Sequence, residues 1–141
     1  MSVNRASTDY IVIHCADTFA KMDIGRAEID RWHRDKGWNA IGYHKVIRRN
    51  GVIEDGRPLD TIGAHVEGFN AKSVGICMVG GRGEDGPEDN FTARQWESLR
   101  NLVIGLKEKY PRAKIVGHRD LNSGKACPSF DVSAWREREG V

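Results

Sequence analysis

Residues 9–16 read DYIVIHCA, and the apolar run inside this stretch decides how the rest of the chain is interpreted. The run has the length of a β-strand and is rich in β-branched residues, and its apolar residues do not alternate with polar ones. Such a strand is buried on both faces, as in a sheet that carries helices on both sides. The stretch therefore predicts a central strand with His14 near its end.

Two further stretches resemble the first. SVGICMVGG (73–81) and AKIVGH (113–118) are short apolar runs that predict two more strands, the second of which ends at His118. YHKVIRRNGVIEDGR (43–57) predicts a hairpin, because two strand-like runs flank Asn50-Gly51, a strong turn signal.

Helical segments separate these strands. Asp23 is a candidate N-cap for a helix that runs to about Lys36. A polar loop (82–90) precedes a second helix, where Thr92 and Gln95 have the spacing of a capping box. The apolar face of this helix is formed by Trp96, Leu99, Val103, Leu106 and Tyr110. Residues 132–139 predict a short terminal helix.

The alternation of strands and helices predicts an α/β fold with a central mixed β-sheet flanked by helices. A length of 141 residues suits one domain, 1–141, in which residues 1–7 are expected to form a flexible N-terminal tail. In folds of this class, functional groups gather where buried strands end.

Composition narrows the functional classes. The chain has 22 basic and 20 acidic residues, a formal net charge of +2, and the two signs are interleaved, so nothing favours nucleic-acid binding. We find no secretory signal and no apolar stretch of about 18 residues, which predicts a protein that is cytoplasmic at synthesis and does not bind membranes. We expect a monomer.

Two histidines occupy equivalent places in the predicted strands. If the strands that end in His14 and His118 are parallel neighbours, both imidazoles emerge at one end of the sheet, and Cys127 follows in the next loop. Two imidazoles and a thiolate suit zinc, and three protein ligands leave a position open for water, as in catalytic sites. The alternative is that both histidines are hydrogen-bonded core residues and that the thiol has no functional role. The spacing of the residues alone does not decide between this interpretation and a zinc site.

Two other residues could serve such a site. Lys125 lies two positions before Cys127, where its ammonium could stabilise an oxyanion. The phenol of Tyr43, at the start of the hairpin, could bond to the attacking water or to the tetrahedral oxygen. The alternative for Lys125 is a solvated loop residue without a function. The alternative for Tyr43 is an ordinary strand aromatic whose hydroxyl lies at the edge of the packed core.

Four blocks of sequence together resemble the zinc N-acetylmuramoyl-L-alanine amidases, and most of all the small lysozymes (endolysins) of T-odd bacteriophages. The blocks are IVIHCADT, GWNAIGYHKVIRRNGVIEDGR, GAHVEGFNAKSVGICMVGG and GHRDLNSGKACPSFD, and the likeness runs from about residue 7 to about residue 138. Peptidoglycan recognition proteins are more distant relatives.

The resemblance implies hydrolysis of the amide between N-acetylmuramic acid and L-alanine in peptidoglycan, by an endolysin that acts in host cell lysis. It implies one zinc ion held by His14, His118 and Cys127, with Tyr43 and Lys125 as catalytic residues. Such an enzyme would reach the wall after another protein permeabilises the membrane. Inhibition of the phage RNA polymerase is a possible second role. Loop position alone suggests three substrate-binding residues, His65, Asn70 and Arg57.

Two rival functions follow from the same residues. A non-catalytic peptidoglycan-binding module would share the fold, although such modules usually lack the cysteine ligand, so that Cys127 favours an enzyme. A glycosidase would need two carboxylates at a set separation, and the neighbouring residues Glu54 and Asp55 diverge on a strand.

Overall fold

The computed structural model describes residues 3–141 and contains the predicted central sheet. Within that range the sheet has five strands in the order β4-β3-β5-β1-β8. They comprise β1 (Tyr10–Cys15), β3 (Lys45–Ile47), β4 (Ile53–Asp55), β5 (Ser73–Met78) and β8 (Lys114–Gly117). Strand β1 is parallel to β5 and β8, β3 is parallel to β5, and only β4 is antiparallel to its neighbour, so the sheet is mixed as expected.

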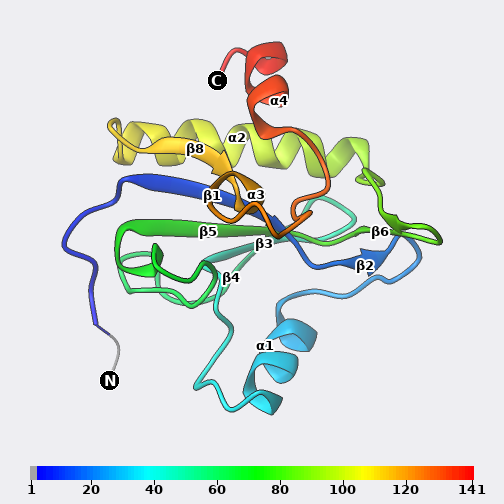
Figure 1. Ribbon diagram of the computed structural model, residues 1–141, viewed down its shortest axis with the longest axis horizontal. Helices are drawn as coiled ribbons and strands as arrows, with labels where there is room; N and C mark the ends of the chain where they lie inside the picture. Colours follow the sequence, from blue (N-terminus) through cyan, green and yellow to red (C-terminus); the bar gives the residue numbers. More distant parts are fainter. Residues whose placement is uncertain (1–2) are drawn as a thin grey trace.

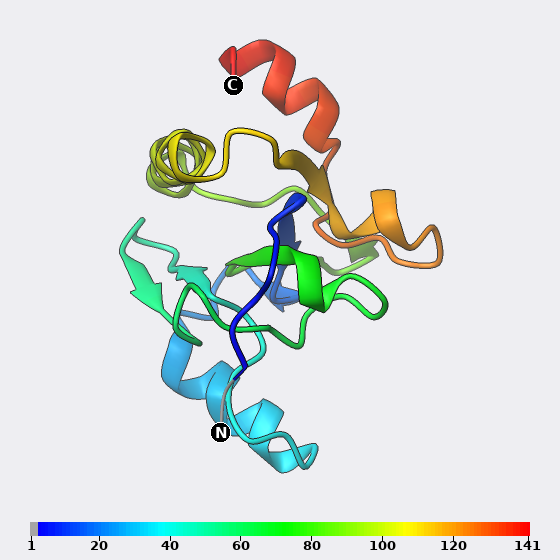
Figure 2. The same cartoon turned by 90° about the vertical axis from the view of Figure 1, so that its left-hand side faces the viewer.

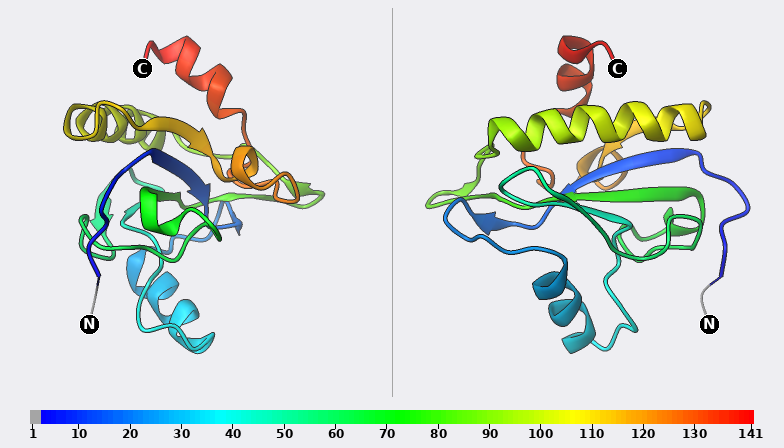
Figure 3. Two further views of the ribbon diagram at one scale, coloured as in Figure 1. Left: turned by 60° about the vertical axis from the view of Figure 1, so that its left-hand side comes forward. Right: turned by 180° about the vertical axis from the view of Figure 1, so that it is seen from behind.

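Helices cover both faces of this sheet, as Figures 1 and 2 show. Helix α2 (Ala93–Lys109) and helix α4 (Val132–Glu139) lie on one side, and α1 (Arg26–Asp35) lies on the other. Seen from behind, α2 runs along the sheet and α1 projects below it (Figure 3). The larger apolar core lies under α2 and α4 and includes Ile13, Ile76, Leu99, Val103 and Trp135. The smaller one, under α1, contains Ile29, Ile41, Val46, Cys77 and Val79.

Smaller elements complete the described chain. A second sheet has the order β2-β6-β7, from β2 (Thr18–Phe19), β6 (Gly81–Gly83) and β7 (Gly86–Pro87). A 3₁₀ turn, η1 (Asn70–Lys72), leads into β5, and the one-turn helix α3 (His118–Leu121) follows β8. His118, expected at the end of a strand, is therefore the first residue of a helix.

The local signals around α2 and the hairpin are confirmed. Thr92 is the N-cap of α2, its hydroxyl accepts from Gln95 N at 3.1 Å, and the Gln95 side chain accepts from Thr92 N at 3.0 Å. Gly51 has φ +86°, and a Cβ there would lie 2.9 Å from the Arg94 carbonyl oxygen. Both the backbone conformation and the lack of space therefore favour glycine at this turn.

The start of α1 was predicted wrongly. The helix begins at Arg26 with Gly25 as its N-cap, not at Asp23. Glu28 accepts from Gly25 N, and Glu54, from strand β4, accepts from Arg26 N at 2.9 Å. Asp23 lies 3.5 Å from the Arg48 guanidinium instead. A long-range carboxylate thus satisfies the helix terminus that a local cap was expected to satisfy.

A flexible tail was expected over residues 1–7, and residues 1 and 2 lie outside the described part of the chain. Beyond them, Asn4 forms a β-bridge with Thr61. The Arg5 guanidinium donates to Leu59 O at 2.6 Å and to Thr61 O at 2.7 Å. These contacts join residues 4 and 5 to the loop that follows the hairpin.

Candidate metal centre

The register of two parallel strands brings His14 and His118 together. Ile13 of β1 is paired with Gly117 of β8, so the residues that follow these two, His14 and His118, emerge at the same end of the sheet. The ring centroids of His14 and His118 are 4.6 Å apart. The parallel arrangement expected of these strands is therefore present, and it places two imidazoles where open α/β sheets carry their sites.

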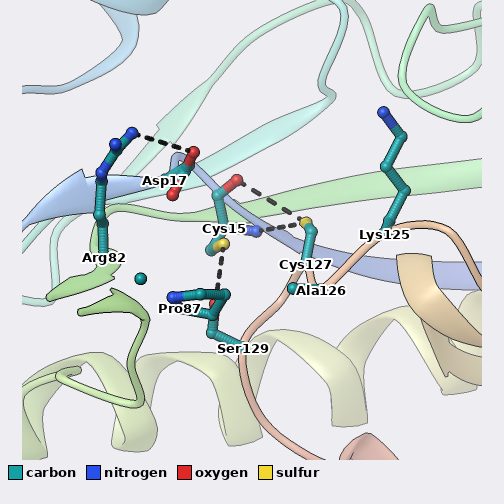
Figure 4. Close-up of a pocket in the computed structure, with 9 residues that line it drawn as sticks. Cys15, Asp17, Arg82, Pro87, Lys125, Ala126, Cys127 and Ser129 are labelled. Atoms are coloured by element: carbon teal, nitrogen blue, oxygen red, sulfur yellow. Dashed lines mark hydrogen bonds and ion pairs between the residues drawn. The ribbon is translucent and has the colours of Figure 1, made fainter.

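Cys127 completes a cluster of three potential ligands. One ligand atom from each of His14, His118 and Cys127 lies within 4.8 Å of the other two. The backbone N–H of Cys15 donates to Cys127 Sγ at 3.1 Å (Figure 4). Arg119 N donates to Cys127 O at 2.9 Å. The loop that carries the cysteine is thus tied to the end of β1 and to α3.

The donor set fits zinc. Burial, together with the nearby His65 and His118, lowers the pKa of His14 well below its usual value, so the ring is neutral and can offer a lone pair. Burial and Lys125 also lower the pKa of His118. The Cys15 side chain and burial raise the pKa of the Cys127 thiol, so a metal would have to displace its proton. Two neutral imidazoles and one thiol, with no carboxylate among them, are ligands that zinc prefers.

Tyr43 lies against the cluster. Its ring centroid is 5.1 Å from that of His14, just before β3. Burial, followed by the nearby cysteines, raises the pKa of the phenol well above its usual value. The side chain therefore keeps its proton at neutral pH and can donate a hydrogen bond.

Lys125 is exposed on the loop that carries Cys127. Both residues line a cavity of about 320 Å³, together with Cys15, Asp17, Arg82, Gly86, Pro87, Ala126 and Ser129. Figure 4 shows the thiol of Cys127 facing Cys15, while the Lys125 side chain extends away from the strand ends. Of the three cluster residues, Cys127 thus borders a space that could hold part of a substrate, and the Lys125 side chain lines the same space.

Sequence reasoning missed two charged residues of this cavity. Arg82 Nη1 lies 3.6 Å from the Asp17 carboxylate, and the Arg82 guanidinium lies over the Phe19 ring. Asp17 has φ +58°, which is uncommon for a residue other than glycine. The polar loop 82–90 was recognised, but a single sequence does not reveal that β6 pairs with β2 and carries Arg82 to the cavity.

The three expected substrate-binding residues do not gather at the cavity. His65 is buried, with both ring nitrogens in hydrogen bonds to other side chains. Asn70 accepts from the backbone N–H groups of His65 and Val66. Arg57 donates to two backbone carbonyls and lines a different cavity, of about 720 Å³, next to Arg26. Their contact with a substrate stays a prediction.

Comparison with known proteins gives one consistent family. Residues 4–130 match the family model described as N-acetylmuramoyl-L-alanine amidase. The endolysin of Escherichia phage T7 is 43% identical over 135 residues, which cover 95% of this chain and 89% of that protein. The likeness to T-odd phage lysozymes expected from the four sequence blocks is thus confirmed.

Solved structures support the same grouping. The amidase LysC from Clostridium intestinale superposes with a TM-score of 0.82 at 31% identity, covering 96% of this chain and 87% of that one. Drosophila peptidoglycan-recognition protein LB (PGRP-LB) superposes with a TM-score of 0.79 at 26% identity, covering 97% of this chain and 84% of that one. The predicted fold class and the more distant relation to recognition proteins are both confirmed.

Proposed function

Because the chain belongs to the N-acetylmuramoyl-L-alanine amidase family, we propose that it is a zinc-dependent amidase of bacterial peptidoglycan. It hydrolyses the amide between the lactyl group of N-acetylmuramic acid and L-alanine. The observation that carries the proposal is the cluster of His14, His118 and Cys127 beside Lys125 and Tyr43, which lies within the matched residues.

The cluster would hold one zinc ion through two imidazole nitrogens and the Cys127 sulfur. When bound, zinc supplies Lewis-acid chemistry, which polarises a carbonyl and makes water nucleophilic near neutral pH. The strand ends and the Cys15 N–H bond fix the ligands before a metal arrives, so little reorganisation is needed.

Lys125 stabilises negative charge on the scissile carbonyl oxygen. Its side chain lines the cavity next to Cys127, where a lysine offers up to three N–H donors. A donor placed where charge develops in the transition state contributes about 3–4 kcal/mol to the lowering of the barrier.

Tyr43 holds a proton at its phenolic oxygen, and its ring packs against that of His14. That proton can bond to the tetrahedral oxygen or be passed to the departing L-alanine nitrogen, which must gain a proton when the amide breaks. Buried surroundings favour the protonated phenol before the reaction. Tyr43 therefore begins the reaction as a hydrogen-bond donor, and if its proton passes to the nitrogen, the proton released by the attacking water restores the phenol.

In biological terms the chain acts as a phage endolysin that lyses the host. Its family includes phage endolysins of nearly the same length. Among residues 3–141 no helix combines the length and the apolar character that a membrane crossing needs. We propose that the protein is made in the infected cytoplasm, acts as a monomer and reaches the wall after another protein has opened the membrane.

Inhibition of the phage RNA polymerase is a separate part of the proposal, which the family resemblance supports. Run-off transcription by the matched phage polymerase, with the chain added in increasing molar excess, tests it. Transcription that falls with added chain supports the second role. Undiminished transcription at high excess removes it and leaves the amidase proposal intact.

Digestion of purified peptidoglycan, followed by mass spectrometry of the soluble products, tests the amidase proposal. We expect stem peptides that begin with a free L-alanine amine, lost after chelation and restored by zinc. A cut between sugars would indicate a glycosidase. Intact wall with bound protein would indicate a binding module and overturn the proposal.

A further inference from the structure

Behind His14 lies a buried chain of hydrogen bonds that the proposed chemistry does not use. His14 Nε2 is 2.8 Å from His65 Nδ1, His65 Nε2 is 3.1 Å from Ser73 Oγ, and Ser73 Oγ is 2.8 Å from the carbonyl oxygen of Phe69. His14, His65 and Ser73 are 1%, 8% and 0% exposed, so water does not compete for these bonds. The chain links a proposed metal ligand to the protein backbone.

The carbonyl at the far end sets the direction of every bond. A carbonyl oxygen only accepts, so the single hydroxyl proton of Ser73 goes to Phe69 O. Ser73 Oγ must then accept from His65 Nε2–H, which leaves a lone pair on His65 Nδ1. That lone pair accepts from His14 Nε2–H. A neutral His14 that carries its proton on Nε2 has its lone pair on Nδ1, and this lone pair can bind a metal.

The His65 ring is fixed in a slot that two glycines create. A Cβ at Gly75 would lie 2.6 Å from His65 Cγ, and one at Gly63 would lie 2.7 Å from His65 Cδ2. The Asn70 side chain accepts from His65 N at 2.8 Å and holds the backbone from which the ring projects. A ring confined in this way cannot turn to present its other nitrogen to His14.

We propose that His65 is a positioning residue, which keeps the proton of His14 on Nε2 and reserves the Nδ1 lone pair for zinc. The inference rests on the proposed function for the presence of the metal. It differs from a substrate-binding role, because both ring nitrogens of His65 are committed inside the protein. A ligand imidazole whose second N–H has a fixed acceptor binds its metal more tightly, and loss of that acceptor lowers metal affinity about 10- to 100-fold.

Two substitutions distinguish the role of His65 as a hydrogen-bond acceptor from its role in filling the space between Gly63 and Gly75. His65→Phe keeps a ring in the space between Gly63 and Gly75 but gives His14 Nε2–H no acceptor. His65→Asn places an amide oxygen the same number of bonds from the backbone as Nδ1, so an acceptor for His14 is retained although the ring is lost. Both variants lose the bond to Ser73, and both should be less stable than the parent.

Competition with a chromogenic chelator measures the zinc affinity of the parent and both variants, and urea unfolding of each metal-free chain measures stability. We expect His65→Phe to weaken zinc binding about 10- to 100-fold and His65→Asn to stay within about threefold of the parent. A purely structural role predicts affinity losses that follow the stability losses. Equal affinities for the parent and His65→Phe would overturn the inference.

Imidazole ¹⁵N spectra of the full-length parent chain locate the protons directly. We expect His14 and His65 both to carry their proton on Nε2, in the zinc-loaded and in the metal-free chain. A proton on Nδ1 of His14 in the metal-free chain would overturn the inference. If the parent binds no zinc, the proposed function fails on its own, and the metal-free spectra still decide where the protons are.

Discussion

His14 and His118 each follow the last paired residues of two parallel strands, Ile13 and Gly117, and their ring centroids lie 4.6 Å apart. Strand register therefore brings two proposed zinc ligands to the same end of the sheet, His14 within β1 and His118 at the first residue of α3 directly after β8. A site on rigid elements is preorganised, and most of the cost of assembling it is already met by folding. The third ligand, Cys127, is the one that a loop supplies.

Replacement of this loop ligand tests the cluster. Cys127→Ser should weaken zinc binding and lower amidase activity by at least about 100-fold, because a hydroxyl is a poor substitute for a zinc-bound thiolate. Equilibrium dialysis with zinc and peptidoglycan turnover measure the two effects.

Cys77→Ala is the matched control for that substitution. Cys77 is a buried cysteine of the smaller core and is not among the proposed ligands. The variant should lose about 1 kcal/mol of stability and keep both zinc and activity. Normal zinc binding by Cys127→Ser would exclude Cys127 as a ligand.

Lys125→Ala should keep zinc and lose turnover. We expect kcat to fall about 100- to 1000-fold with little change in zinc affinity, because the ammonium acts on the transition state and does not touch the metal ligands in the proposal. Steady-state hydrolysis of a muramyl peptide measures it. Lys114→Ala removes the same charge at the far end of β8 and should leave kcat unchanged. A Lys125→Ala protein with near-normal kcat would disprove the oxyanion role.

Tyr43→Phe removes one hydroxyl and keeps the ring that packs against His14. Loss of a general acid typically slows a reaction about 100- to 10,000-fold, so kcat should fall within that range. The midpoint of thermal unfolding and the zinc content should stay close to those of the parent. If Tyr43→Phe turns over as fast as the parent, the proton comes from another donor.

The stability of the metal-free chain should fall in mild acid, in part because of His44. Burial lowers the pKa of His44 to about 4, and its Nδ1 accepts from Gly75 N at 3.0 Å, a bond that protonation destroys. An unfolded histidine has a pKa of about 6.5, so between these values the unfolded chain binds more protons than the folded one. The contribution is complete above pH 6.5 and is lost as the pH falls towards 4, by about 3 kcal/mol at most.

Urea unfolding between pH 7.5 and 4.5 measures this slope. His44→Asn offers Gly75 N an acceptor that does not titrate, so the variant should show a shallower pH dependence than the parent. Because His14 and His65 also have lowered pKa values, part of the slope should survive in the variant. Identical slopes in the two proteins would show that His44 does not contribute.

Much of this architecture was predictable because its signals are local. The β-branched runs predicted the parallel strands β1, β5 and β8. Asn50-Gly51 predicted the hairpin, and Thr92 with Gln95 predicted the start of α2. The candidate ligands were predictable for the same reason, since a histidine near the end of each of two buried strands needs only parallel pairing to bring the two together. That pairing had to be assumed, and the structure contains it.

Other features depend on contacts between distant parts of the chain. Glu54 bonds to the first turn of α1 from 28 positions away, so the expected cap at Asp23 was wrong. The bond between His14 and His65 spans 51 positions and depends on the room left by Gly63 and Gly75. A loop histidine flanked by glycines looked like a binding residue, because nothing in the sequence shows that its ring points inward.

The central claim is that His14, His118 and Cys127 hold one zinc ion, and X-ray absorption of the zinc-loaded chain tests it most directly. The account predicts one sulfur ligand at about 2.3 Å and two imidazole nitrogens at about 2.0–2.1 Å from the metal, at one zinc per chain. The sulfur contribution should vanish in Cys127→Ser. A zinc shell of oxygen and nitrogen alone in the parent chain would contradict the account.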